Sequence, residues 1–172
     1  AAMITEFPCG LLLMPQAMRD PLLFSPLTPT SDFAEFVSKL EISDVRARFG
    51  CPLDAESLLP LLAPLGPACR AIGAWKGRTL VGVGMLAKLA GDQCEFALLV
   101  RSDVKRRRIG TALAHRAFSE ALELGAREVV AHVRSDNTAA LGLVRSLGFL
   151  SVGGPGLELF FVAHLSARQA AG

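Results

Sequence analysis

The segment from Val100 to Leu113 reads VRSDVKRRRIGTAL and contains a change from one structural pattern to another. Apolar residues before it alternate as in a β-strand, and after Gly110 they recur with the spacing of an α-helix. Four consecutive basic residues, Lys105 to Arg108, stand at this change from strand to helix. Three interpretations of the charge are open: a nucleic-acid patch, a solvated helix face, or a seat for a phosphorylated ligand.

The composition indicates a single globular domain. The chain has 172 residues, of which 51% are hydrophobic and 20% charged, and its formal net charge is only +2. A general nucleic-acid binder is usually more basic, so the basic run is a local feature. The longest apolar run near the start, GLLLMPQAM, is too short for a membrane span and follows no Lys or Arg. We therefore expect neither a membrane segment nor a signal peptide.

The four cysteines are widely spaced and form no Cys-x-x-Cys pair or Cys/His cluster. This pattern argues against structural zinc, or any other metal site, and against a disulfide framework. It fits the reducing environment of the cytoplasm, where we expect the protein to reside. These residues are Cys9, Cys51, Cys69 and Cys94.

Periodicity predicts helices first, then a β-meander, then alternating strands and helices, which is an α/β (α+β) architecture with a mixed sheet. The two strands on either side of the long helix should be parallel and joined by a right-handed crossover. The expected elements are a strand at 22–24, a helix capped by Thr30 or Ser31, helices at 43–49 and 54–66, strands at 69–75, 79–90 and 93–102, a helix at 109–124, a strand at 127–133, a helix at 137–147 and final strands from Gly148.

The basic turn before Ile109 has the properties of an anion site. The first N–H groups of a helix lack intrahelical partners, and the helix dipole favours negative charge there. A pyrophosphate would bind well, although a solvated charged helix start explains the residues equally well. Further on, Asn137 is placed to cap the helix that follows it, and its amide could also touch a ligand lying across the sheet.

Together these stretches resemble the GNAT superfamily of acyl-CoA-dependent N-acetyltransferases. The coenzyme A signature of that family, Q/R-x-x-G-x-G/A, aligns with Lys105 to Gly110, and its later N-x-x-A-x-x-L…G-F pattern matches Asn137 to Phe149. The segments 33–49, 94–113 and 136–149 look like the catalytic domain of bacterial protein lysine acetyltransferases. The resemblance implies a mostly antiparallel central sheet flanked by helices.

The resemblance also implies one acyltransferase domain over residues 21–172, with residues 1–20 an N-terminal arm or a segment added in cloning. The chain departs from the family pattern at two positions. Arg108 stands at the first signature glycine, and Val144 stands where many members use a tyrosine to protonate the departing thiolate. The chain contains no tyrosine. The protein-acetylating subfamily also lacks that tyrosine, so the second departure agrees with the narrower resemblance.

The co-substrate that the resemblance implies is acetyl-CoA. Its diphosphate would lie on the basic turn and its pantetheine arm along the preceding strand, where a main-chain N–H near Leu99 would polarise the thioester carbonyl. The predicted cofactor-binding residues are Leu98, Leu99, Val100, Lys105, Arg106, Arg107, Arg108, Ile109, Gly110, Thr111 and Asn137.

Glu95 is the predicted catalytic residue. An acceptor amine must lose a proton before it attacks a thioester, and the usual lysine pKa is about 10.4, so a general base helps. Strand alternation places Glu95 among apolar neighbours, where burial would raise its pKa. The resemblance likewise implies a catalytic glutamate at this place. The other interpretation is that Glu95 pairs with Arg101 or Lys88, or is only half-buried.

The three histidines are weaker candidates for catalysis. His115 is expected on the surface of the long helix, and His132 is expected either in the sheet or facing the acyl cleft. His164 lies near the end of the chain with no partner evident from the sequence.

The predicted function is transfer of an acetyl group from acetyl-CoA to a primary amine by direct attack. A protein lysine is the preferred acceptor, and a small-molecule amine is the nearest alternative. A catalytically silent coenzyme A sensor or interaction module is a further alternative, and a nucleic-acid binder is the least favoured. We expect no metal, nucleic-acid or membrane partner, and a monomer or homodimer.

Overall fold

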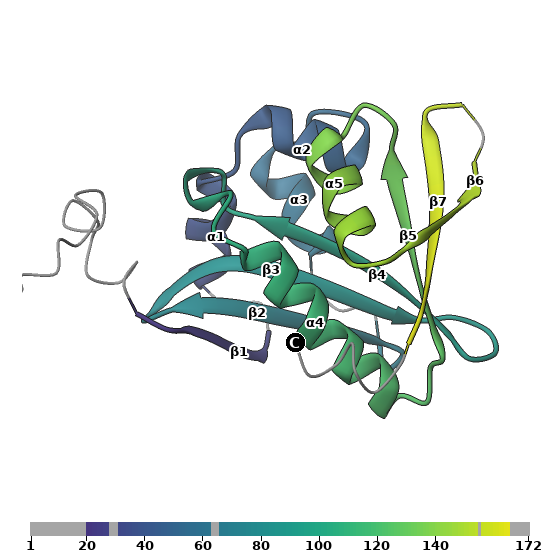
Figure 1. Ribbon diagram of the computed structural model, residues 1–172. Coiled ribbons are helices and arrows are strands. Elements are labelled where there is room, and N and C mark those ends of the chain that lie inside the picture. The colour runs from purple at the N-terminus through teal and green to yellow at the C-terminus, as the bar shows by residue number, and fades with distance from the viewer. Residues whose placement is uncertain (1–19, 28–30, 63–65, 155, 166–172) are drawn as a thin grey trace, which may run out of the picture.

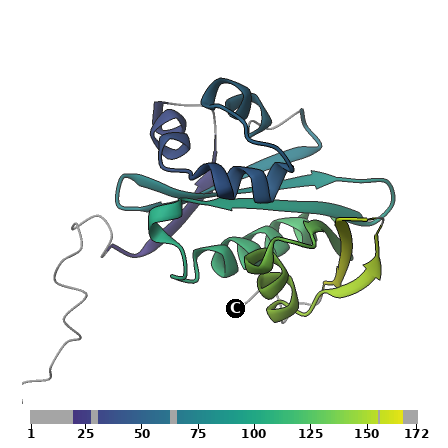
Figure 2. The same cartoon turned by 90° about the horizontal axis from the view of Figure 1, so that it is seen from above.

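Within the part of the chain that the computed structural model describes, residues 20–27, 31–62, 66–154 and 156–165, seven strands form one mixed sheet. The strand order is β1-β2-β3-β4-β5-β7-β6. Helices cover both faces, with α1, α2 and α3 on one side and α4 and α5 on the other (Figures 1 and 2). The α/β architecture and the mostly antiparallel sheet are confirmed. Nearly all of the predicted N-terminal arm lies outside the described residues.

The first part of the chain contributes an edge strand and the three helices of one layer. Helix α2 ends where Gly50 adopts a left-handed backbone with φ 81° and donates its N–H to the carbonyl of Arg46. Helix α3 begins where the Asp54 side chain accepts the N–H of Ser57 at 2.8 Å. These elements are β1 (Leu22–Pro26), α1 (Ser31–Ser38), α2 (Ile42–Phe49) and α3 (Ala55–Leu61). Thr30, one of the two predicted caps, lies outside the described residues.

The predicted β-meander is confirmed. Its turns fall at Gly77 and Gly91, whose φ angles of 58° and 73° are those that favour glycine. Each strand pairs antiparallel with the next, and the β2–β3 ladder shifts register between Ala74 and Trp75. The three strands are β2 (Cys69–Lys76), β3 (Thr79–Lys88) and β4 (Gln93–Val100).

The second half alternates strands and helices as expected. Strands β4 and β5 are parallel, which confirms the crossover prediction. In the sheet, β7 lies between β5 and β6, an arrangement that the order of the strands along the chain does not predict. Strand β6 is therefore an edge strand, and Leu150 and Val152 on it are 63% and 61% exposed. The elements are η2 (Ser102–Val104), α4 (Ile109–Glu123), β5 (Glu128–Arg134), α5 (Thr138–Ser146), β6 (Leu150–Gly153) and β7 (Glu158–His164).

The alternation along β4 builds two cores, one on each face of the sheet. Cys94 and Phe96 are buried on the face covered by α4, and Leu98 packs against the same cluster. Leu99 is buried in the smaller cluster beneath α1, α2 and α3. The predicted assignment of alternate β4 residues to opposite faces is confirmed.

The described residues include three of the four cysteines and the helices that bear on the membrane prediction. The three cysteines in this part of the chain, Cys51, Cys69 and Cys94, are free thiols, whereas Cys9 lies outside it. None of the described helices combines the length and the apolar character that a membrane crossing requires.

Helix α4 lies unusually close to the sheet because β3 offers it glycines. A Cβ at Gly82 would meet Leu113 at 2.8 Å and Ile109 at 3.1 Å, both closer than ordinary contacts. Leu113 is fully buried. This close contact fixes the height of the start of α4 above strands β3 and β4.

We expect Gly82→Ala to destabilise the protein by about 1–3 kcal/mol, because the added methyl group overpacks the contact between α4 and β3. Gly142 in α5 is the matched control, since a Cβ there meets nothing within 4 Å. Gly142→Ala should instead stabilise by about 0.5–1 kcal/mol through helix propensity. Urea unfolding of both variants measures the difference, and equal effects would contradict the close-packing argument.

Candidate active site

The site begins where β4 and β5 part. These strands pair only at Gln93–Glu128, Cys94–Val129 and Glu95–Val130, after which β4 stays with β3 and β5 with β7. The two strands diverge as the arms of a V (Figure 1). A cavity of about 620 Å³ occupies the opening and is lined by β4, β5, α2, α4, α5 and the basic turn. Its volume is in the range of small-molecule and cofactor sites.

The opening leaves backbone groups of β4 without a strand partner. Arg101 donates its N–H to Val81 across the β3–β4 ladder, and Leu89 donates to Gln93. Hydrogen-bonded pairs alternate along an antiparallel ladder, so Leu99 also faces β3. The N–H groups of Leu98 and Val100 are thereby directed into the opening. The sequence analysis expected a donor near Leu99, and Leu98 and Val100 are the residues next to it whose N–H groups have this direction.

The start of α4 supplies further free donors. Among the described residues, no acceptor receives the backbone N–H of Ile109, Gly110 or Thr111, and no side chain caps the helix. All three residues line the cavity. With the helix dipole, these free amides have the properties that an anion site requires, so the site stays a prediction that this geometry suits.

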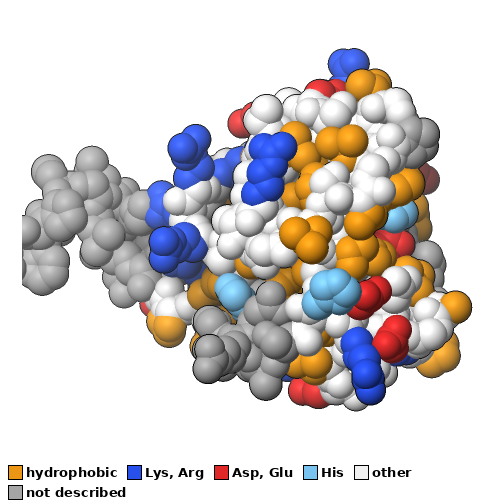
Figure 3. All heavy atoms as spheres, turned by 45° about the vertical axis from the view of Figure 1, so that its right-hand side comes forward, with side chains coloured by type: hydrophobic (Ala, Val, Ile, Leu, Met, Phe, Trp, Pro, Cys, Tyr) orange, Lys and Arg blue, Asp and Glu red, His pale blue; other side chains and the backbone are white. Residues whose placement is uncertain are grey.

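The basic turn adds charge and a strained backbone. Arg106 and Arg108 have φ angles of 61° and 60°, in the left-handed region that costs a residue with a Cβ roughly 1–2 kcal/mol. Arg108, which aligns with the family's signature glycine, therefore has a glycine-like backbone conformation. Strain of this kind accumulates at ligand sites. On the face in Figure 3, most Lys and Arg side chains gather on one side, which agrees with a local basic feature.

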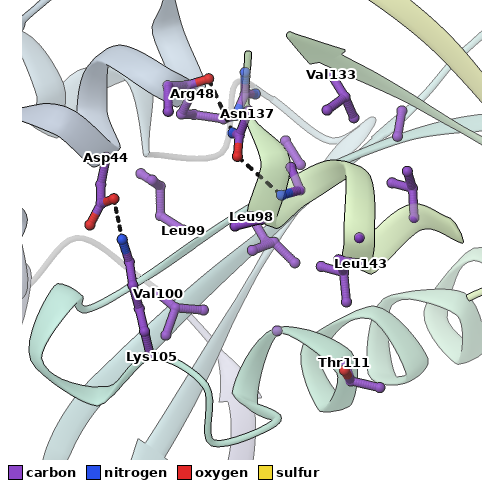
Figure 4. Close-up of a pocket in the computed structure, with 18 of the residues that line it drawn as sticks. Asp44, Arg48, Leu98, Leu99, Val100, Lys105, Thr111, Val133, Asn137 and Leu143 are labelled. Carbon is purple, nitrogen blue, oxygen red and sulfur yellow. Dashed lines mark hydrogen bonds and ion pairs between the residues drawn. The ribbon is translucent and has the colours of Figure 1, made fainter. Parts of the chain in front are cut away.

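Lys105 turns toward α2. Its ammonium group pairs with the Asp44 carboxylate (Figure 4). Ser102 in the preceding turn donates its hydroxyl to the same carboxylate at 2.5 Å and accepts the N–H of Glu41 at 2.8 Å. Lys105 thus ties the turn to α2 while lining the cavity.

A buried arginine holds the same turn to α1. Arg101 donates two hydrogen bonds to Asp103, at 2.7 and 3.0 Å, and lies 3.5 Å from Glu35. The hydrogen bonds from Arg101 lower the pKa of Asp103. Charge pairing therefore fixes the turn from both α1 and α2.

Asn137 uses both ends of its amide. Its Oδ1 accepts the N–H of Ala140 at 3.0 Å, which confirms the predicted helix cap. Its Nδ2 donates to the carbonyl of Ala47 in α2 at 3.2 Å (Figure 4). Asn137 also lines the cavity, so it joins α5 to α2 beside the opening. All predicted cofactor-binding residues line the cavity except Arg107.

Glu95 lies at the last residue pair before the strands part, half-buried on the α2 face. It does not line the cavity, which begins one residue further along β4. Among the described residues, no hydrogen bond or ion pair engages its carboxylate. The partners considered from the sequence are engaged elsewhere, because Arg101 bonds to Asp103 and Lys88 donates to the Leu124 carbonyl.

The three histidines lie in different surroundings. His132 lines the cavity, its Nδ1 lies 3.9 Å from Glu158, and its ring packs at a tilt against Phe160, with the ring centroids 4.7 Å apart. His115 is half-buried on α4 and meets Phe118 edge-on. The Nδ1 of His164 lies 3.1 Å from the Glu128 carboxylate, a partner that the sequence did not show.

Helix α2 supplies two site residues that the sequence analysis did not identify. Asp44 and Arg48 are four residues apart, so they lie on one face of the helix, and both line the cavity. The four-residue spacing of Asp44 and Arg48 was the feature of the sequence that could have placed them on one face of the helix. Among the described residues no group of His, Cys, Asp and Glu is arranged to hold a metal. Val144, at the place of the family tyrosine, is a buried wall of the cavity.

Comparison with known proteins identifies the family. The model of the acetyltransferase (GNAT) family matches residues 39–149, about two thirds of the chain, and this stretch contains the strand opening and the basic turn. The chain therefore belongs to the GNAT acetyltransferase family. It is an acyltransferase whose co-substrate is acetyl-CoA. No curated protein matches the chain.

Solved structures share the fold at low identity. The GNAT domain of S. lividans PAT is 19% identical, covers 83% of this chain and 89% of its own, and gives a TM-score of 0.72. The PaiA N-acetyltransferase of Thermoplasma acidophilum in complex with coenzyme A is 14% identical, covers 84% of this chain and 99% of its own, and gives a TM-score of 0.66. The ribosomal-protein-alanine N-acetyltransferase of Brucella melitensis is 19% identical, covers 83% of this chain and 99% of its own, and gives a TM-score of 0.63.

We expect Arg108→Gly to be more stable than Arg108→Ala by about 1 kcal/mol, because only glycine adopts φ 60° without a steric cost. Both variants remove the same cation, so the comparison isolates backbone strain from charge. Urea unfolding of the unliganded proteins measures the gap. Identical midpoints and slopes would show that Arg108 is not strained.

Asn137 allows its two contacts to be separated. Asn137→Ser retains a good N-cap but loses the donor to Ala47, and should cost about 0.5–1.5 kcal/mol. Asn137→Ala loses the cap as well and should cost about 1 kcal/mol more. Equilibrium unfolding should rank the wild type above the serine variant and the serine variant above alanine. A serine variant as unstable as alanine would show that the cap contributes little.

Proposed function

We propose that this protein transfers the acetyl group of acetyl-CoA to a lysine side chain of a protein, with Glu95 as the general base. The observation that carries the proposal is the position of Glu95. Its carboxylate is free of hydrogen bonds and ion pairs to the described residues, on the α2 face of the sheet, where β4 and β5 part. Phe96, the next residue along β4, lines the cavity, so Glu95 stands at the edge of the opening.

The residues of the opening suit acetyl-CoA. The amides of Ile109, Gly110 and Thr111, with the Arg106 and Arg108 side chains, would hold the diphosphate. The backbone of β4 at Leu98 and Val100 would bond to the pantetheine arm as a strand does. One of these N–H groups would hydrogen-bond the thioester oxygen and stabilise the negative charge that develops there during attack.

In the proposed reaction the Glu95 carboxylate takes a proton from the acceptor ammonium, directly or through one water. The amine nitrogen forms a bond to the carbonyl carbon, and the carbon–sulfur bond breaks. The second amine proton is lost to solvent, and the thiolate takes a proton from water, because Val144 replaces the tyrosine and has no proton to give. Direct attack requires no acyl-enzyme.

The lysine acceptor is supported by the sequence segments that look like bacterial protein lysine acetyltransferases. The shared fold with a ribosomal-protein-alanine N-acetyltransferase adds a neighbour whose acceptor is a protein. A small-molecule amine stays the nearest alternative. A panel of purified proteins, lysine peptides and polyamines, followed by thiol release from acetyl-CoA, separates the two.

Glu95→Gln tests the proposed base. We expect kcat to fall about 10²–10⁴-fold while the affinity for acetyl-CoA stays unchanged, because the amide cannot accept the amine proton. Thiol release measures turnover, and calorimetry measures acetyl-CoA binding. The rising limb of the pH–rate profile should also move toward the pKa of the free amine.

The matched control is Glu56→Gln, which removes an exposed glutamate in α3 away from the cavity and should leave both quantities unaltered. A Glu95→Gln enzyme with full turnover would overturn the assignment of the base. A wild-type protein that binds acetyl-CoA but acetylates nothing on the panel would favour a coenzyme A sensor.

A further inference from the structure

The α2 face of the sheet carries charged groups of both signs around the opening. Val129, Ala131 and Val133 of β5 are buried, so the residues alternating with them face α2, and His132 is among these. Glu95 of β4 faces the same way. Glu158 of β7 lies beside His132. Arg48 of α2 lies over this face and lines the cavity with His132.

Within the described part of the chain, Arg48 is a cation whose charge no carboxylate pairs with directly. Its Nε is buried and has no hydrogen-bond partner, and the guanidinium lies over the Phe49 ring at 5.0 Å. It forms no ion pair with the described carboxylates. Burial lowers the pKa of Arg48, whereas the more distant charges of Glu95 and Glu158 raise it. A guanidinium has five N–H donors, and in this half-buried side chain the buried Nε is costly unless an acceptor reaches it.

In the proposed placement of acetyl-CoA, its diphosphate is not the anion that Arg48 would meet. The diphosphate seat is at the start of α4, where Arg106, Arg108 and the free amides lie. Arg48 belongs to the acceptor side with Glu95 and Glu158, which would repel a polyanion. An acceptor that carries both an ammonium and a carboxylate group would pair its ammonium with the glutamates and its carboxylate with Arg48.

We propose that Arg48 is a specificity-determining residue that binds a carboxylate adjacent to the acetylated amine. In a protein acceptor this carboxylate belongs to an acidic side chain next to the target lysine. The proposal rests on the proposed function and adds the acceptor class. The ammonium is received at Glu95, and the carboxylate is received by the planar donors of the Arg48 guanidinium, which suit it better than a lysine would.

Two lysine peptides that differ only in Glu or Gln next to the lysine test the proposal. We expect the wild type to prefer the Glu peptide in kcat/KM by roughly tenfold or more, the size of a charge-assisted hydrogen bond. Arg48→Gln should abolish that preference, and Arg48→Glu should reverse it toward a Lys-flanked peptide. The matched control is Arg46→Gln, an exposed arginine on the same helix that does not line the cavity.

Retained acetyl-CoA binding shows that each variant is folded. A preference that is absent in the wild type, or that survives in Arg48→Gln, would overturn the role of Arg48.

Failure of the proposed function would look different. If no peptide is acetylated but small amines are, the acceptor is not a protein lysine. Free lysine and lysinamide then replace the two peptides, because they also differ only in a carboxylate and its amide. If nothing is acetylated, calorimetry of the two peptides against protein saturated with coenzyme A reports the preference without turnover. Equal or undetectable binding of both peptides there would also overturn the proposal.

Discussion

The parting of β4 from β5 after three residue pairs is the constraint on which the rest of the structure depends. Two parallel strands in one sheet normally satisfy each other's backbone groups, and buried N–H groups rarely stay unpaired. Here the ladder stops, and the donors of Leu98 and Val100 face the opening. The sheet stays continuous only through these three pairs, while β3 and β7 pair with the outer sides of the two strands. The same interruption that weakens the sheet forms a slot in which an extended ligand can take the place of a strand.

Helix α2 connects the two halves of this slot. It pairs with Lys105 of the basic turn through Asp44, accepts a hydrogen bond from Asn137 at the start of α5, and places Arg48 beside the cavity. The basic turn and the proposed acceptor face are therefore attached to one short helix. The left-handed arginines add to this arrangement, because a turn under backbone strain needs the surrounding pairs of Arg101, Asp103 and Asp44 to hold its shape.

The sequence predicted the elements well because their signals are local. The 3.6-residue and two-residue periods, the Asn137 cap and the turn glycines at 77 and 91 each depend on a few neighbouring residues. The position of β7 between β5 and β6 could not be predicted, since pairing of distant strands leaves no local trace. Arg48 and Asp44 were missed for the same reason: on α2 they look like ordinary surface charges until the fold places them over the slot. The partner of His164 is likewise a contact between strands far apart in the chain. Glu95 was predicted because its strand neighbours are apolar, but its freedom from Arg101 and Lys88 could be known only from the positions of Asp103 and the end of α4.

The cavity reaches from the residues of α4 on one side of the sheet to those of α2 on the other. The two ends of this cavity differ in character: the α4 end is lined by free amides and cations, the α2 end by side chains of both signs. A donor at the first end and an acceptor at the second would occupy the protein together. The kinetics that this architecture favours are those of a ternary complex, in which either product can depart without crossing the path of the other.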